Sequence, residues 1–436
     1  MPSSFSCHHD TLCLAPSPHA QEAGYTRPTV QNRLAATTTS NAVAKKLQAA
    51  FSSEDHEASF PAPLVLPEDE ISWDPKYPAQ SLRSWVREKE RNAVTEERKA
   101  IYVAPPPGNT DDVGFVQDWA IPEHGKQKRK SEKQIALPEF EDLMNYLRAF
   151  YYPLPVKRLP SSEHPTFASW DTKSRTKKNA SYIALNSATE STRIRVRATS
   201  SYPFTHQLNL NDILDHAIAI LPDDAYALLL VTEHDLFEGD DDDFCCGRAY
   251  GGSRIAVVSM ARYNPTLVPV GEHEWPTSHC ETFVKEACNI PYQPKPKKRA
   301  KIASSSSTTS SQLGPISAAV KAFAAAPSPS VQDVWLARLA RTASHELGHC
   351  FALDHCVYYA CVMQGTAGLK EDMRQPPYLC PVCESKVGSA VRTIDPDAGL
   401  QERYEAMLGF CDKWNGGLFA GFGAWIRARL EIMQTS

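Results

Sequence analysis

An H-E-x-x-H pattern at His345, Glu346 and His349, followed by His355, constrains the fold of this chain more than any other feature. Two histidines four residues apart on a helix share one face and lie one turn apart. Their imidazole nitrogens can therefore bind one Zn²⁺, and the glutamate between them can reach a water on that metal. His355 can supply a third nitrogen if the chain turns sharply after His349. Three protein ligands and one open position are typical of a catalytic zinc site.

The pattern by itself has another interpretation, an amphipathic helix whose charged face carries two histidines. Three features favour the metal. Ser330 is a typical helix-capping residue, and helically spaced apolar residues follow it: Val331, Val334, Trp335, Leu336 and Leu339. His355 stands at the spacing used by the metzincin peptidases. Met363 follows eight residues later, where that group places a methionine turn beneath the metal.

Four cysteines after His355 form a second group with metal-binding spacing: Cys356, Cys361, Cys380 and Cys383. A C-x-x-C pair can place both sulfurs on one metal, and two pairs make a tetrahedral four-thiolate zinc site. Disulfides are the alternative. The first thirty residues lack the apolar core of a secretory signal, so we expect a reducing compartment, which favours metal. Such a zinc has no open position, so we expect it to be structural.

The run from His345 to Cys383, HELGHCFALDHCVYYACVMQGTAGLKEDMRQPPYLCPVC, resembles the archaemetzincins, a metzincin branch that fuses a three-histidine with a four-cysteine zinc site. Residues 225–263 resemble the family's strand, acidic loop, edge strand and central strand. Residues 100–105 and 150–159 are similar more loosely to its first and second strands. The resemblance covers roughly residues 98–411, with an interruption near 291–330.

The resemblance implies an α/β (α+β) fold: a metzincin-like, twisted, mixed five-stranded sheet over an active-site zinc helix, with a small C-terminal subdomain around a four-cysteine structural zinc. It implies two zinc ions per chain, one catalytic and one structural. Glu346 maps onto the general base and Met363 onto the methionine turn. The implied metal ligands are His345, His349 and His355 for the first zinc, and Cys356, Cys361, Cys380 and Cys383 for the second.

Two further segments bear on how such a site would work. Metzincin substrates lie antiparallel along an exposed edge strand, and residues 244–250 match it; an ordinary hairpin arm needs the same strand, so the sequence leaves both open. Ala352 stands where metzincins usually have glycine with positive φ. Alanine in that conformation costs about 1 kcal/mol. Because metal binding contributes ~10 kcal/mol, we expect the turn to form.

Composition predicts three parts along the chain. Residues 1–70 are rich in Ser, Thr, Ala and Pro and are expected to be a disordered tail. Residues 71–97 are a helical or extended lead-in, with a charged helical stretch at 84–99. Residues 98–436 form the peptidase-like domain, with a disordered insertion at 291–330. The basic run at 295–301 is either a nuclear localisation signal or a solubilising linker.

Individual elements and the remaining cysteines follow from local patterns. We expect helices at 138–150, 209–221, 397–408 and 418–433, and a buried strand at 227–233. Residues 240–243 are four consecutive aspartates without the alternating spacing of a calcium loop, which favours a solvated acidic loop. We expect the other cysteines of the domain to be small buried apolar groups: Cys245, Cys246, Cys280, Cys288, Cys350 and Cys411.

The overall composition excludes other classes of function. A net charge of −5 indicates neither a nucleic-acid nor an anionic-membrane partner, and no apolar run reaches membrane length. We therefore predict an intracellular protein, cytoplasmic and/or nuclear, whose partner is a peptide or protein substrate; the sequence does not indicate its oligomeric state. The predicted function is a zinc-dependent metallopeptidase with Glu346 as general base, and the resemblance suggests aminopeptidase-like action on short peptides.

The alternative is a non-catalytic zinc-stabilised module that binds a protein or peptide. The presence of Glu346 favours the enzyme, because a scaffold needs metal ligands but no base.

Overall fold

The structure is a computed structural model that describes residues 11–49, 53–123, 135–170, 180–199, 203–269, 273–290, 314–414 and 416–435. The helices are α1 His19–Ala23, α2 Val30–Ala36, α3 Asn41–Ala49, α4 Ser53–Ser59, α5 Glu70–Trp73, α6 Leu82–Val86, α7 Val116–Trp119, α8 Phe140–Phe150, α9 Leu210–Ala219, α10 Glu281–Ala287, α11 Pro315–Ala325, α12 Val331–Cys350, α13 Leu369–Asp372, α14 Pro381–Val391, α15 Leu400–Cys411 and α16 Gly417–Thr435. The strands are β1 Ala100–Ala104, β2 Gly108–Asn109, β3 Val156–Arg158, β4 Thr166–Ala168, β5 Tyr182–Asn186, β6 Ser191–Ala198, β7 His206–Asn209, β8 Ala225–Thr232, β9 Leu236–Phe237, β10 Gly247–Tyr250 and β11 Ile255–Ser259.

A mixed five-stranded sheet forms the centre of the molecule, in the order β10-β11-β8-β1-β3. Its inner strands run parallel, and β10 pairs antiparallel with β11 at one edge. Every residue of β8 is buried, as expected for a parallel strand that is covered on both faces. This confirms the predicted mixed sheet, the buried strand near 227–233 and the edge position of the segment ending at Tyr250.

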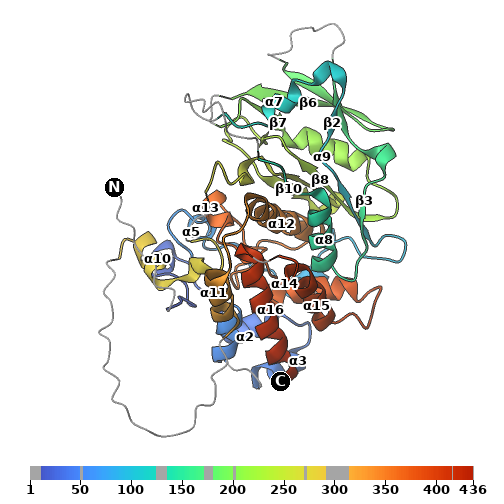
Figure 1. The fold of residues 1–436 in the computed structure, drawn as a ribbon. Helices are drawn as coiled ribbons and strands as arrows, with labels where there is room; N and C mark the ends of the chain where they lie inside the picture. Colours follow the sequence, from blue (N-terminus) through green and yellow to red (C-terminus); the bar gives the residue numbers. More distant parts are fainter. Residues whose placement is uncertain are drawn as a thin grey trace.

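A helix covers each face of this sheet (Figure 1). The upper face packs on α9, whose Ile213 and Leu214 share a core with Leu228 and Leu230 of β8. The lower face packs on α12 through alternate residues of the same strand, Leu229 among them. Successive side chains of a strand point to opposite faces of the sheet, so alternate residues of β8 belong to two different cores. The lower core contains α12.

A second sheet of six strands, β2-β4-β5-β6-β7-β9, lies above α9 and was not predicted. Its strands are short, and β6 alternates between buried and outward-facing residues, with Ile194 inside and Arg195 outside. Arg195 donates to Asp212 on α9, which joins the sheet to the helix. Because β6 alternates polar and apolar residues and the other strands are only two to five residues long, the segment offered little apolar signal in the sequence.

The C-terminal helices close the lower part of the molecule, as predicted. Trp425 of α16 is fully buried, stacks on Tyr378 with ring centroids 4.2 Å apart, and donates its indole N–H to the carbonyl of Ser59. α11 packs along α16. The prediction that residues 291–330 are disordered is therefore wrong for residues 314–330, which include α11. The basic run at 295–301 lies outside the described residues.

The N-terminal part also differs from the expectation. Within the described residues, the tail expected to be disordered over 1–70 contains α1 to α4, and its side chains fill gaps on the body of the molecule. Tyr25 and Val65 are buried with Val357 in a separate apolar cluster. The long-range contacts made by a few anchoring residues outweigh the polar composition on which the expectation rested.

Two further expectations are corrected. The helix expected over 84–99 is only the short α6, because Trp85 turns inward to donate to the carbonyl of Phe351 and Asn92 donates to Gly252. Cys280 is disulfide-bonded rather than a free apolar group. The cysteines proposed as zinc ligands are free thiols.

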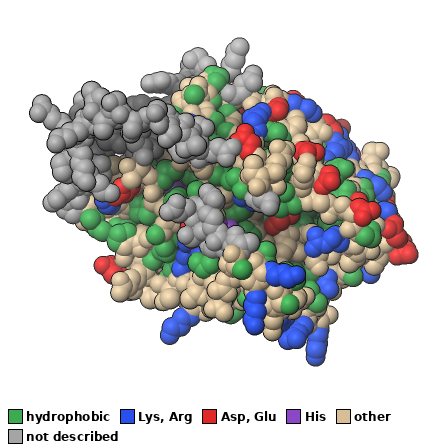
Figure 2. Space-filling view, turned by 90° about the horizontal axis from the view of Figure 1, so that it is seen from below, with side chains coloured by type: hydrophobic (Ala, Val, Ile, Leu, Met, Phe, Trp, Pro, Cys, Tyr) green, Lys and Arg blue, Asp and Glu red, His purple; other side chains and the backbone are tan. Residues whose placement is uncertain are grey.

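The surface seen from below carries both signs of charge (Figure 2). Lys and Arg side chains gather mainly along its edges, with apolar and uncharged groups between them. Among the described residues, no helix combines the length and the apolar character needed to cross a membrane.

Candidate metal centre and active site

The first two histidines come from the last turns of α12. Ser330 caps the helix reciprocally with Asp333, as its position predicted, and the helix runs for 20 residues to Cys350. His345 and His349 lie one turn apart, with their Nε2 atoms 3.0 Å from each other. The helix thus presents two imidazole nitrogens on one side.

A tight turn after α12 brings the third histidine back toward them. Ala352 adopts φ 57, the left-handed conformation expected at this position. Ala352 N–H donates to the carbonyl of His349 at 2.8 Å, and Leu353 N–H donates to that of Gly348 at 3.2 Å. These two bonds form a Schellman turn, which normally has glycine at the left-handed position.

Replacing Ala352 with glycine should stabilise the zinc-loaded protein by up to about 1 kcal/mol, because glycine enters the left-handed region without the Cβ clash. Urea unfolding measures the change. Ala326→Gly is the matched control, since Ala326 has φ −70 and gains nothing from glycine. A less stable Ala352→Gly variant would show that the turn is not strained.

Each histidine has its Nδ1–H bound to a different acceptor. His345 donates to the carbonyl of Val362 and His349 to that of Leu353, both at 2.7 Å. His355 donates to Glu70 Oε1 at 2.8 Å. These bonds fix the tautomer and leave the Nε2 lone pairs free for a metal.

The three imidazoles fit a zinc ion. Burial lowers the pKa of His345 to about 3 and the pKa of His349 well below its usual value, which keeps both in the neutral, metal-binding form. One nitrogen from each histidine lies within 4.8 Å of the others. Zinc–nitrogen bonds of about 2 Å place tetrahedral ligands a little over 3 Å apart. The three nitrogens therefore lie close enough together to surround one zinc ion.

The four predicted cysteines also converge. Cys356, Cys361, Cys380 and Cys383 are buried, with their sulfurs within 4.8 Å of one another. The sulfurs of Cys356 and Cys380 are 3.6 Å apart, close to the roughly 3.8 Å between thiolates on one tetrahedral zinc. The backbone N–H groups of Met363 and Cys380 donate to Cys361 Sγ. This donor set fits a closed zinc site.

The loop between the two groups connects them mechanically. Cys356 N–H donates to the carbonyl of Met363 at 2.7 Å, and the neighbouring Val362 carbonyl orients His345. Met363 packs directly against Gly348, where an added Cβ would lie 2.3 Å from its sulfur. A change that disorders the cysteine cluster is therefore expected to displace His345 as well, because this loop contacts both groups.

Glu346 projects from α12 between the histidines and the edge strand. It is 8% exposed and lies beside Gly247, where an added Cβ would be 3.1 Å from Glu346 Cγ. Burial raises the pKa of Glu346 to about 8; the Asp372 carboxylate adds to this and Arg248 opposes it. A carboxyl in this setting can exchange a proton near neutral pH.

A cavity of about 520 Å³ opens over these residues. One wall is the edge strand β10, and the floor is the histidine group with Glu346. Its remaining wall was missed by the sequence argument, because it comes from the lead-in segment through Gln80, Glu88 and Glu90. Glu70 was missed as well. It lies 285 positions from His355, and no local pattern signals such a pairing.

Comparison with known proteins agrees with this arrangement. The model for peptidase family M54 matches residues 316–389, which contain both proposed zinc sites. Archaemetzincin-2 of Macaca fascicularis is 26% identical over 358 residues, which are 82% of this chain and 76% of the relative. Archaemetzincin-2 of Rattus norvegicus is 27% identical over 357 residues, 81% of this chain and 74% of that protein. In sequence, the chain is thus similar to the archaemetzincins.

The family model and these relatives show that the chain is a zinc metallopeptidase. Human Archaemetzincin-2 is 30% identical over 210 residues, 48% of each chain. Among solved structures, archaemetzincin (amzA) from Methanopyrus kandleri matches with a TM-score of 0.31 at 15% identity, covering 68% of this chain and 97% of that one.

Proposed function

We propose that this archaemetzincin-like chain hydrolyses peptide bonds at the three-histidine site with Glu346 as general base, and that the four cysteines hold a second, structural zinc. One observation carries the proposal. Three imidazoles with their Nδ1 atoms already bound present Nε2 to a common point, and a buried carboxyl with no metal-binding duty lies beside them. A scaffold would need the first feature but not the second.

Zinc bound to the three histidines would make a water acidic and polarise the substrate carbonyl. In this proposal Glu346 transfers the proton. Its carboxylate takes a proton from the attacking water and delivers it to the leaving nitrogen, so the amine departs neutral. Because Gly247 has no side chain, the Glu346 carboxylate faces the cavity without obstruction.

The substrate backbone would lie along β10. This strand is the edge of the sheet, and its residues Gly247, Arg248 and Ala249 line the cavity. An extended peptide added to this edge forms strand-like hydrogen bonds that are independent of its sequence, and the scissile bond then lies over Glu346.

The cavity wall favours a positively charged group near one end of the peptide. Glu88, Glu90 and Asp354 line it, whereas Arg248 is already paired with Glu238. Such a field attracts a cation and repels a carboxylate. This supports aminopeptidase-like action, in which a free α-ammonium group enters the acidic end of the cavity.

Peptides with a free N-terminus should be cleaved with a kcat/KM about tenfold above that of their acetylated forms, a difference of about 1.4 kcal/mol. The double substitution Glu88→Gln with Glu90→Gln should reduce this preference by raising KM for the free form. Glu431→Gln, an exposed change on α16, is the control. Equal cleavage of both peptide forms by the wild type would contradict the aminopeptidase mode and leave an endopeptidase.

A further inference from the structure

We propose that Glu70 is a positioning residue for the catalytic metal, supplied by the N-terminal segment rather than by the metallopeptidase core. The inference rests on the proposed function of the three-histidine site and adds a residue to it. Its carboxylate accepts the Nδ1–H bond of His355 at 2.8 Å and holds that ring toward the other two.

His355 needs such a partner more than the other ligands do. His345 and His349 are fixed by α12 and by carbonyls of adjacent loops. His355 lies beyond the turn, its side chain is 29% exposed, and its Nδ1 partner is a side chain. A carboxylate acceptor both orients an imidazole and increases its basicity toward a metal, and losing such partners typically weakens metal binding by about 10–100-fold.

Gly365 leaves the space in which Glu70 meets His355. A Cβ added at Gly365 would lie 2.1 Å from Glu70 Oε1 and 2.5 Å from His355 Nδ1. Any side chain there would therefore separate the pair. The glycine belongs to the same loop as Met363, so the core loop and the N-terminal segment fit each other at the metal site.

The turn at residues 65–69, just before Glu70, has a strained backbone and is fixed by several hydrogen bonds and an ion pair. Val65 has φ 55 and Glu68 has φ 70, conformations that each cost about 1–2 kcal/mol for residues with a side chain. Ser17 Oγ donates to the carbonyl of Val65 at 2.6 Å, and Asp69 forms an ion pair with Arg374. The N–H of Glu70 donates to Glu371 at 2.9 Å. Strain that is held in this way is typical of a functional segment.

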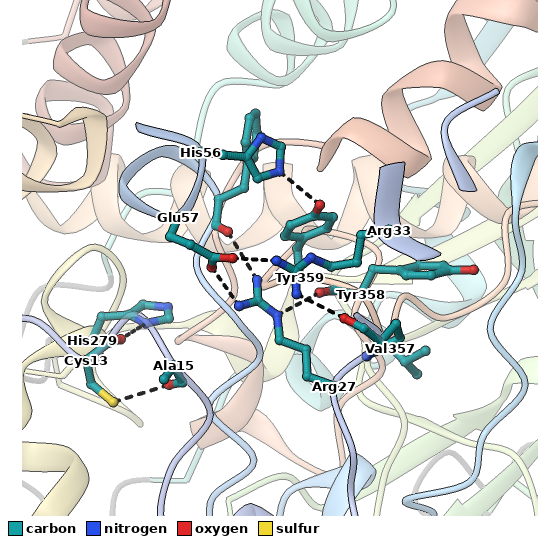
Figure 3. A network of polar contacts seen from close by, with 12 residues as sticks. Cys13, Ala15, Arg27, Arg33, His56, Glu57, His279, Val357, Tyr358 and Tyr359 are labelled. Atoms are coloured by element: carbon teal, nitrogen blue, oxygen red, sulfur yellow. Dashed lines mark hydrogen bonds and ion pairs between the residues drawn. The ribbon is translucent and has the colours of Figure 1, made fainter. Parts of the chain in front are cut away.

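Residues upstream of Glu70 contact the loop between Cys356 and Met363 (Figure 3). Arg27, for example, donates to the carbonyl of Tyr358. Arg27 and Arg33 both pair with Glu57, and Tyr25 donates to the carbonyl of Val357 at 2.7 Å. In Figure 1, α5 accordingly lies beside α13, to the left of the active-site helix α12, and the N–H of Glu70 donates to Glu371 of α13. The N-terminal part therefore packs against the segment that contains His355 and Cys356, and Glu70 forms its hydrogen bond to a proposed ligand.

Cobalt-substituted full-length protein separates this role from a purely structural one. Co²⁺ on histidine ligands and Co²⁺ on four thiolates have distinct spectra, so chelator titration reports the two sites separately. Glu70→Ala should weaken the histidine site by about 10–100-fold and leave the thiolate signal unchanged. Glu70→Gln keeps an acceptor oxygen and should lie between Glu70→Ala and wild type. Asp74→Ala, an exposed change just after α5, should have no effect.

Kinetics at saturating zinc provide a second readout. Glu70→Ala should lower kcat with little change in KM, because it disturbs the metal and not the peptide-binding wall. Glu70→Ala that folds and binds cobalt at the histidine site within twofold of wild type would overturn the proposal. A cobalt-binding protein that cleaves no peptide would instead contradict the proposed function, and the metal affinities would still decide the role of Glu70.

Discussion

Replacing Glu346 with glutamine should lower kcat by about 10²–10⁴ while both zinc ions stay bound. Glutamine is nearly isosteric with glutamate and can occupy the same buried space beside Gly247, but its amide cannot take up the proton of the attacking water. No metal-ligand atom is changed. KM should move little, because the peptide is bound by β10 and by the cavity wall rather than by the base.

Three measurements make this test decisive: zinc content per chain, melting temperature and peptide turnover. Glu431→Gln carries the same chemical change at an exposed position of α16 and should match the wild type in all three. Undiminished turnover by Glu346→Gln would mean that another group is the base or that a contaminating protease is present. A zinc-loaded wild type without turnover on a broad peptide library would favour the non-catalytic binding module.

The parts of the site predictable from the sequence are those encoded locally. A helical period placed His345, Glu346 and His349 together, and the left-handed turn at Ala352 follows from the need to bring back His355. The C-x-x-C spacing put Cys380 and Cys383 side by side. These features depend on residues within one or two turns of each other.

The rest depends on contacts between distant segments. Glu70 and Glu88 belong to a polar stretch without periodicity, and only packing against the finished domain places them at the cavity. The second sheet was missed for a related reason. Strand β6 carries arginines at three alternate positions and therefore has no apolar run in the sequence. Its pairing with β5 and β7 could not be predicted for that reason.

Changing Cys380 and Cys383 to serine should remove one zinc ion and unfold much of the lower part of the molecule. Structural zinc contributes on the order of 10 kcal/mol to folding, which is comparable with the whole stability of a typical domain at about 5–15 kcal/mol. Activity should disappear as well, because the Cys356–Met363 loop supplies the carbonyl that orients His345. Circular dichroism, zinc content and turnover would each show the loss.

Two controls separate metal binding from simple burial of a hydroxyl. Cys411 is buried and free but lies outside the cluster, so Cys411→Ser should cost only about 1–3 kcal/mol and keep both metals. His345→Ala should remove the other zinc with a smaller loss of stability, since the histidine site is open to the cavity.

A single zinc ion in fully loaded wild type, or a disulfide between Cys380 and Cys383, would contradict the structural-zinc assignment. Both cysteines are free thiols in the structure, and their sulfurs converge with those of Cys356 and Cys361. Cys380 caps the start of α14 and Cys383 lies within its first turn, while the sulfur of Cys380 faces Cys356 across the loop at 3.6 Å. Four thiols that converge from two separate segments gain more from one shared metal than from a bond within one turn.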